Sequence, residues 1–223
     1  MPPEKTQIEI PYGVVEYTAF FNEPIFEGWD NPTLQVNVLR ALSPYGFNLD
    51  GVEYKGESEK ASEHAIVFRR TNPATPGMNL TLGLGKAVIT AENLDWSEAE
   101  RFVLTMKTAL GAILDTAPAS LRSQQVALGM HIQLKSKQRK DVTMPLLSAE
   151  GLRILEGNIS FPGIVLHVEK GHIVVDASAV FANGLFIRLF REHSPDAPLE
   201  MLAEVLRKDE ERVFEVLGLE GTL

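Results

Sequence analysis

Hydrophobic and polar residues alternate along several stretches of the chain, a pattern typical of strands with one buried face. The clearest stretch runs from Gln124 to Lys135, where every second side chain is apolar. A second runs from Met78 to Thr90, with Gly83 and Gly85 marking a bend. Shorter β-branched and aromatic runs predict further strands. These are Val14 to Phe21, Gly51 to Gly56, Ala65 to Arg70, Ile164 to Glu169, His172 to Ser178 and Leu185 to Arg191.

Helical spacing of apolar residues appears between these strands. The strongest prediction is a helix from Ser97 to Asp115, in which Ser97 and Glu100 form a capping box ahead of a continuous apolar stripe. Asn31 and Pro32 are typical of a helix start. Two more helices are expected, a short one at Ser148 to Leu155 and an acidic one at Leu199 to Leu217 with a break near Asp209.

The order of these elements indicates an α+β fold. We expect an antiparallel or mixed β-sheet, built from a meander plus C-terminal hairpins, with helices packed mainly on one side. The whole chain, 1–223, is expected to form a single domain. The alternative is a seam near 140–148 that separates 1–140 from 148–223. The loop Thr71 to Gly77, with two prolines and a glycine, is either a lid or a connector.

Composition excludes several classes of protein. The chain contains no cysteine, which removes disulfides, thiolate metal sites and cysteine nucleophiles. Its formal net charge of -9 argues against a uniformly basic surface for nucleic acid. The first residues lack the apolar segment of a signal peptide, and no apolar run approaches a membrane span. We therefore expect an acidic, soluble, cytoplasmic protein without membrane contact.

Familiar catalytic and nucleotide-binding motifs are missing. Gly83-Leu84-Gly85-Lys86 supplies two glycines of a dinucleotide fingerprint but lacks the third, and the next helix is not expected until Ser97. A bend in a strand is the simpler interpretation. The sequence contains no P-loop, nucleophile elbow, zinc-protease helix or EF-hand loop.

One cluster of residues is suited to a metal. A hairpin turning at Lys170-Gly171 would pair Glu169 with His172 and place His167, Glu169 and His172 on one face. Two imidazoles and a carboxylate can bind a divalent metal. The alternative is an ordinary solvated face of a half-covered sheet. A one-residue change of register would separate the three side chains.

Two further features concern partners. The basic run from Lys135 to Lys140 has no interleaved aromatic residues for stacking, so nucleic acid is an unlikely partner by this pattern. Aromatic residues are dense at two places, where they either fill the core or anchor an interface. These residues are Tyr17, Phe20, Phe21, Phe26, Trp29, Phe181, Phe186 and Phe190.

These patterns predict a non-catalytic protein-binding or assembly protein, either a homo-oligomer or an accessory subunit, without a cofactor. The alternative is a metal-dependent or small-molecule enzyme that uses a divalent metal on the His/Glu face of hairpin 164–178.

Overall fold

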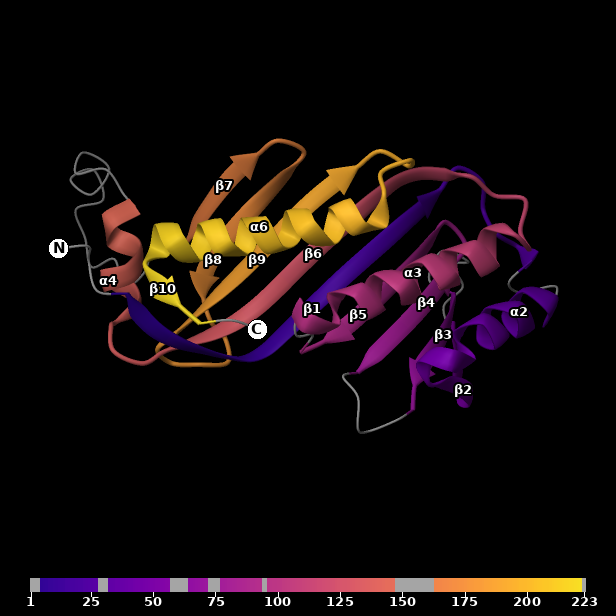
Figure 1. The fold of residues 1–223 in the computed structure, drawn as a ribbon, viewed down its shortest axis with the longest axis horizontal. Helices are drawn as coiled ribbons and strands as arrows, with labels where there is room; N and C mark the ends of the chain where they lie inside the picture. Colours follow the sequence, from indigo (N-terminus) through magenta and orange to yellow (C-terminus); the bar gives the residue numbers. More distant parts are fainter. Residues whose placement is uncertain are drawn as a thin grey trace.

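The computed structural model describes residues 5–27, 32–56, 64–71, 77–93, 96–146 and 163–221. Its strands form one mainly antiparallel sheet, and its three longer helices lie along one face of that sheet (Figure 1). The strands are β1 (Thr6–Phe21), β2 (Phe47–Lys55), β3 (Ala65–Arg70), β4 (Met78–Gly83), β5 (Lys86–Glu92), β6 (Leu121–Leu134), β7 (Ile164–Val168), β8 (Gly171–Ala177), β9 (Gly184–His193) and β10 (Leu219–Glu220). The helices are α2 (Pro32–Leu42), α3 (Ala99–Leu114), α4 (Arg139–Thr143) and α6 (Leu199–Leu217), with 3-10 turns at Ser43–Tyr45, Trp96–Glu98 and Met144–Leu146.

The sheet has two halves that repeat one arrangement. Its strand order is β2-β3-β4-β5-β1-β6-β9-β8-β7, with β10 added in parallel to one end of β1. In each half a long strand, β1 or β6, is followed by a helix, a meander and a last strand that returns antiparallel to the long one. Helix α3 or α6 then follows. The two long strands pair antiparallel with each other, so they form the centre of the sheet.

The predicted fold class is confirmed, since strands and helices form a mainly antiparallel α+β arrangement. Strands from both sides of residues 140–148 belong to the same sheet. A single domain nevertheless stays a prediction. No helix in the described ranges has the length and apolar character needed to cross a bilayer.

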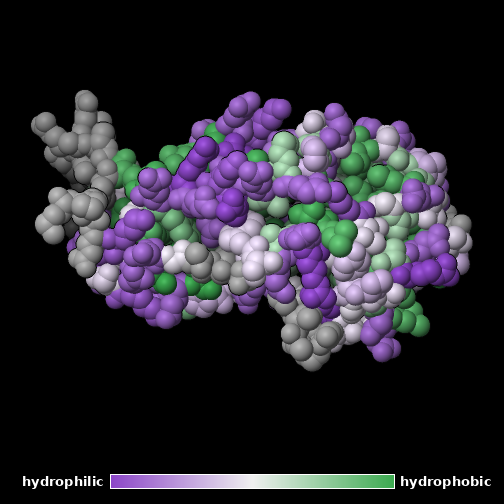
Figure 2. Space-filling view, viewed as in Figure 1, coloured by the Kyte–Doolittle hydropathy of each residue, from purple (hydrophilic) through white to green (hydrophobic). Residues whose placement is uncertain are grey.

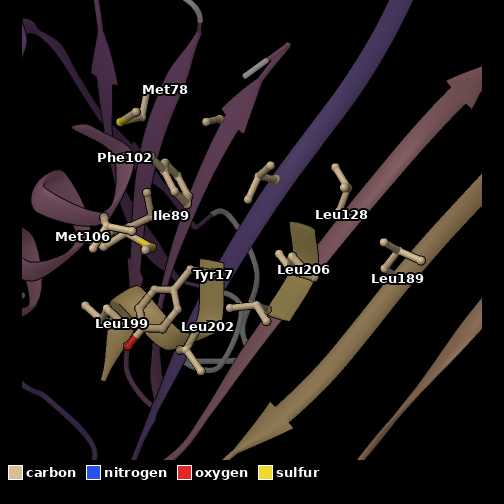
Figure 3. Close-up of a cluster of buried hydrophobic side chains, with 14 of the residues drawn as sticks. Tyr17, Met78, Ile89, Phe102, Met106, Leu128, Leu189, Leu199, Leu202 and Leu206 are labelled. Atoms are coloured by element: carbon tan, nitrogen blue, oxygen red, sulfur yellow. The ribbon is translucent and has the colours of Figure 1, made fainter. Parts of the chain in front are cut away.

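The core lies between the sheet and the helices. In β6 the alternation predicted from the sequence is confirmed, because Val126, Leu128, Met130 and Ile132 are buried while the residues between them are less so. Figure 3 shows side chains of α6 beside those of the central strands, with Leu202 and Leu206 near Tyr17. Burial of such apolar surface contributes about 25 cal/mol per Å² and is the main force that holds the helices on the sheet.

A buried polar network connects β1 to the segment before α6. The Tyr17 hydroxyl donates to Gln124 Oε1 at 2.7 Å, and burial raises the pKa of this phenol. Gln124 Nε2 donates to the carbonyls of Ser194, Pro195 and Ala197 at 3.1, 2.8 and 3.0 Å. Because buried polar groups are costly unless they are paired, this network fixes where the chain leaves β9 and enters α6.

One predicted strand forms two strands in the structure. The stretch Met78 to Thr90 forms the hairpin β4–β5, in which Leu82 pairs with Ala87. The bend predicted at the two glycines is a full reversal. The carbonyls of Leu84 and Gly85 accept hydrogen bonds from the backbone N–H groups of Ile25 and Phe21, so the turn is held by the segment that follows β1. Those contacts are remote in sequence, which explains why alternation alone missed the turn.

Helix boundaries also differ from the predictions in detail. Helix α3 begins at Ala99 after a 3-10 turn, and its N-cap is Glu98 without a side-chain cap, so the predicted capping box at Ser97 is wrong. Helix α2 spans Pro32–Leu42 among the described residues, while the predicted cap Asn31 and the predicted helix Ser148 to Leu155 lie outside them. Helix α6 is continuous, without a break at Asp209.

Candidate functional site

The sheet face opposite the longer helices carries a row of rings. Residues on this face alternate with the core residues along each strand, and cross-strand pairing places them side by side. Tyr12 of β1 pairs with His131 of β6, which pairs with Phe186 of β9. A parallel row pairs Phe190 with His172 and His172 with His167. The rings on this open face are Tyr12, Phe20, His131, His167, His172, Phe186 and Phe190.

A hollow of about 230 Å³ lies in the middle of this face. It exists because Gly129 has no side chain and Ala127 a short one, at the point where neighbouring strands carry long side chains. Gly129 pairs with Val14 on β1 and with Arg188 on β9. The residues that line the hollow are Tyr12, Val14, Glu16, Ala127, Gly129, His131, Phe186 and Arg188. The volume is below the range of drug-sized pockets and suits a single planar ring system.

Three rings border the hollow in tilted contact. The His131 ring centroid lies 4.9 Å from that of Phe186 and 6.0 Å from that of Tyr12. The Tyr12 side chain is 42% exposed, so its ring face remains available for stacking. Next to this group the His172 and Phe190 rings stack at 4.8 Å and 24°. At the far end of β1, the Arg122 guanidinium lies 5.5 Å from the centre of the Phe20 ring.

The hydrogen bonds of Ser178 define the tautomer of His131. The Ser178 hydroxyl oxygen accepts from the backbone N–H groups of Val180 and Phe181, both at 3.1 Å. Both of its acceptor positions are thereby used, so its proton is directed to His131 Nδ1 at 2.9 Å. A neutral His131 then carries its own proton on Nε2. That N–H is a donor for a group bound in the hollow.

The hollow also has a charged group of each sign. Arg188 is exposed, and no described residue forms an ion pair with it. Glu16 accepts a long hydrogen bond of 3.4 Å from the Thr18 hydroxyl at one carboxylate oxygen. Its other oxygen makes no hydrogen bond within the described part of the chain. The site therefore combines ring faces, a guanidinium, an imidazole N–H and a carboxylate.

The strand pairing on which the predicted metal cluster rests is not the one in the structure. The hairpin turns at Glu169-Lys170, one residue earlier than expected, so His167 pairs with His172 and Val168 with Gly171. Lys170 adopts the left-handed backbone conformation that this tight turn requires, with φ 54°. Glu169 lies in the turn and pairs with neither histidine. Across the described ranges, no group of three His, Asp or Glu side chains is suited to hold a metal.

Other residues singled out in the sequence have structural roles. Lys135 forms an ion pair with Glu9 at 2.6 Å, and the rest of the basic run leads into α4, which begins with a capping box between Gln138 and Asp141. Of the N-terminal aromatic residues, Tyr17 and Phe21 are in the core. Phe26 is 57% exposed, and Trp29 lies outside the described residues.

Sequence reasoning missed Tyr12, Gly129, Phe186 and Arg188 as members of one site. A partial signal was present, since alternation along β6 places Gly129 and His131 together on its polar face. The other strands contribute their residues through the order β1-β6-β9, which local patterns do not contain.

Comparisons with known proteins do not assign this chain to a family. No family model and no curated protein matches the chain. Among solved structures, the chain is similar to a rolling circle replication initiator protein from Geobacillus stearothermophilus, at 11% identity over 92% of this chain and 80% of that one, with a TM-score of 0.28. Two expectations stand against this likeness and are not retained: a non-catalytic protein-binding or assembly protein with a metal enzyme as its alternative, and a protein partner rather than nucleic acid. At this TM-score the likeness says nothing further about the chain.

Proposed function

We propose that the open face of the sheet binds single-stranded nucleic acid and holds one base in the hollow over Gly129. The observation that carries this proposal is the hollow itself, bordered by the rings of Tyr12, His131 and Phe186. Single strands bind to exposed aromatic side chains on sheets because every base offers a ring face, and each stacked base contributes about 1–3 kcal/mol.

Polar groups around the hollow suit the edge of a base and its phosphate. The Arg188 guanidinium and the His131 Nε2–H are donors, and the Glu16 carboxylate is an acceptor. A base edge presents both kinds of partner, whereas a purely apolar ligand would leave these groups unpaired. Duplex nucleic acid keeps its bases stacked inside, so the site favours single strands.

The net charge of -9 does not oppose this proposal, because much of the acidity lies elsewhere. Helix α6 alone carries six acidic residues, and Figure 2 shows hydrophilic side chains gathered along it on the helix-covered side. The sheet lies between that helix and the open face. Binding is expected to depend mostly on stacking, with a weak dependence on salt since few basic groups can reach phosphates. The lack of cysteine supports a cytoplasmic location as part of the same proposal.

Replacing Gly129 with valine tests the hollow directly. A Cβ at this position would meet the Phe186 ring at 3.7 Å, which is ordinary contact, so the fold should tolerate valine. The added methyl groups would fill the space for the base. Binding of a fluorescently labelled single-stranded oligonucleotide, followed by anisotropy, should weaken at least about 10-fold, as expected from losing one stacked base. Gly111→Ala on α3 is the control, because a Cβ there meets nothing within 4 Å and the position is remote from the hollow, and it should bind like the wild type.

Replacing Tyr12 with alanine tests stacking. Loss of this exposed ring should weaken binding of the same oligonucleotide by about 1–3 kcal/mol. Tyr54→Ala is the matched control, since Tyr54 is 70% exposed but pairs with Ile66, a core residue, and therefore faces the helix side. Equal losses in the two variants, or no binding of single strands by the wild type at low salt, would contradict the proposal.

A further inference from the structure

A second pocket lies on the helix-covered side of the sheet, between helix α6, the β7–β8 turn and the end of β9. It has a volume of about 370 Å³ and is formed by the β7–β8 turn, the end of β9 and the middle of α6. Its lining residues are Glu169, Lys170, Arg191, Glu192, His193, Val205, Lys208, Asp209 and Arg212. None of these residues belongs to the hollow on the open face. The pocket is thus independent of the proposed nucleic-acid site.

The acidic group deepest in this pocket is already neutralised. Asp209 is 3% exposed, and Arg191 donates to its two oxygens at 2.7 and 2.8 Å from Nε and Nη2. The third arm of this guanidinium donates to the Glu169 carbonyl. Nε, Nη1 and Nη2 of Arg191 therefore each donate a hydrogen bond within the protein. Arg191 and Asp209 act together as a neutral, rigid wall of the pocket.

Donors without partners remain around this wall. Lys170 in the turn and Arg212 on α6 form no ion pair with any described residue, and Lys208 is held only by an exposed pair with Glu204 at 2.7 Å. His193 Nε2 is buried and has no hydrogen-bond partner among the described residues. A buried polar atom without a partner is costly, so it indicates a group that a bound molecule would satisfy.

The charges of the pocket favour an anion. Its lining has four Lys and Arg side chains against three carboxylates, in a chain whose net charge is -9. Burial, together with the positive charges of Arg191 and Lys170, lowers the pKa of His193, which keeps the imidazole neutral near pH 7. A neutral imidazole keeps one N–H donor.

We propose that this pocket binds a phosphate group, with Arg212 and Lys170 as charged donors and the imidazole of His193 as a neutral donor. Phosphate fits because it offers several acceptor oxygens to donors that come from three different elements. Inorganic phosphate and the phosphate monoester of a nucleotide share this chemistry. Glu169 and Glu192 are exposed, as are Lys170 and Arg212, so the charged groups of the pocket lie near its opening.

Isothermal titration calorimetry on the full chain tests this site, with inorganic phosphate and a nucleoside monophosphate as separate ligands. Arg212→Gln and Lys170→Asn should each weaken phosphate binding at least about 10-fold, the expected loss of one charge-assisted hydrogen bond. Asparagine is chosen at 170 because it tolerates the left-handed backbone there. Arg207→Gln, on the same helix and paired with Glu211 at 3.2 Å, is the matched control and should bind like the wild type.

The outcomes separate cleanly. Binding of both ligands with similar affinity, lost in Arg212→Gln, identifies phosphate alone as the determinant. Tighter binding of the nucleoside monophosphate, lost in the same variant, identifies a nucleotide as the source. Absence of binding by either ligand at millimolar concentration overturns the proposal, and so does equal binding by the wild type and Arg212→Gln. The outcomes with inorganic phosphate do not depend on the open face, because this ligand has no base to place in the hollow; the open face is tested with Gly129→Val and a labelled single-stranded oligonucleotide.

Discussion

Replacing Arg191 with methionine is expected to lower the free energy of unfolding by about 3–5 kcal/mol at neutral pH, because it leaves a buried carboxylate without its partner. Asp209 is only 3% exposed, and both of its oxygens accept from Arg191. Desolvation of an unpaired charge is the main cost, and the three-dimensional fit of α6 on β9 depends on avoiding it. Urea denaturation at pH 7.5 measures the effect.

A second substitution identifies the cause. In Arg191→Met combined with Asp209→Leu, the unpaired charge is gone, so most of the lost stability should return. Arg207→Met is the matched control, because its pair with Glu211 is exposed on the same helix and should be worth less than about 0.5 kcal/mol. If Arg191→Met costs no more than Arg207→Met, the pair does not hold α6 in place.

Stability is also expected to depend on pH through Glu210. Its side chain is 4% exposed, and one carboxylate oxygen accepts from the Trp96 indole N–H. Its other oxygen has no partner among the described residues. Burial raises the pKa of Glu210 to about 7, and the nearby Glu211 carboxylate adds to this, while the Trp96 hydrogen bond opposes it. The folded protein therefore binds a proton at Glu210 more tightly than the unfolded chain does.

The direction of the effect follows from that difference. Protonated Glu210 contributes fully below its unfolded pKa of 4.5, and the contribution falls as the pH rises towards about 7. Relative to a Glu210→Gln variant, the wild type should therefore lose about 3 kcal/mol of stability between pH 4.5 and 8. Only the pH dependence of this stability difference is diagnostic. Glutamine cannot ionise, but its side-chain amide meets the same lack of a hydrogen-bond partner in the folded protein.

Thermal or urea unfolding of the wild type and of Glu210→Gln, from the unfolded pKa of 4.5 to above the folded pKa of about 7, measures this change in stability. Glu215→Gln is the control, since Glu215 is an exposed carboxylate on the same helix and should track the wild type at every pH. A difference between wild type and Glu210→Gln that stays constant with pH would show that Glu210 is ionised in the folded state.

Local patterns predicted most of the elements but not the turn that decides the metal site. Alternation along the 164–178 hairpin was read correctly as two strands, and its apolar face is indeed buried at Ile173 and Val175. The register depends on one residue in the turn, and it moved Glu169 out of the histidine face. A sequence with Lys-Gly at this point favours a turn at those residues, yet the left-handed Lys170 shifts it by one.

The continuity of helix α6 also depends on a contact between residues remote in sequence, which local patterns do not contain. Asp209 in the middle of a helix suggested a break, because aspartate is a poor helix former in isolation. Its carboxylate is instead paired with Arg191, which lies 18 residues earlier in the chain. Tertiary pairing of that kind outweighs a propensity of less than about 1 kcal/mol.

The sequence by itself determined most of the long strands and helices in the described residues, the buried face of strands such as β6, and the lack of cysteine chemistry, because these properties follow from local periodicity and composition. The tertiary structure decided which strands are neighbours, and with them the hollow shared by Tyr12, Gly129 and Arg188 and the basic pocket beside His193. The physical reason is that strand order and register are set by contacts between residues remote in sequence, which no local pattern records.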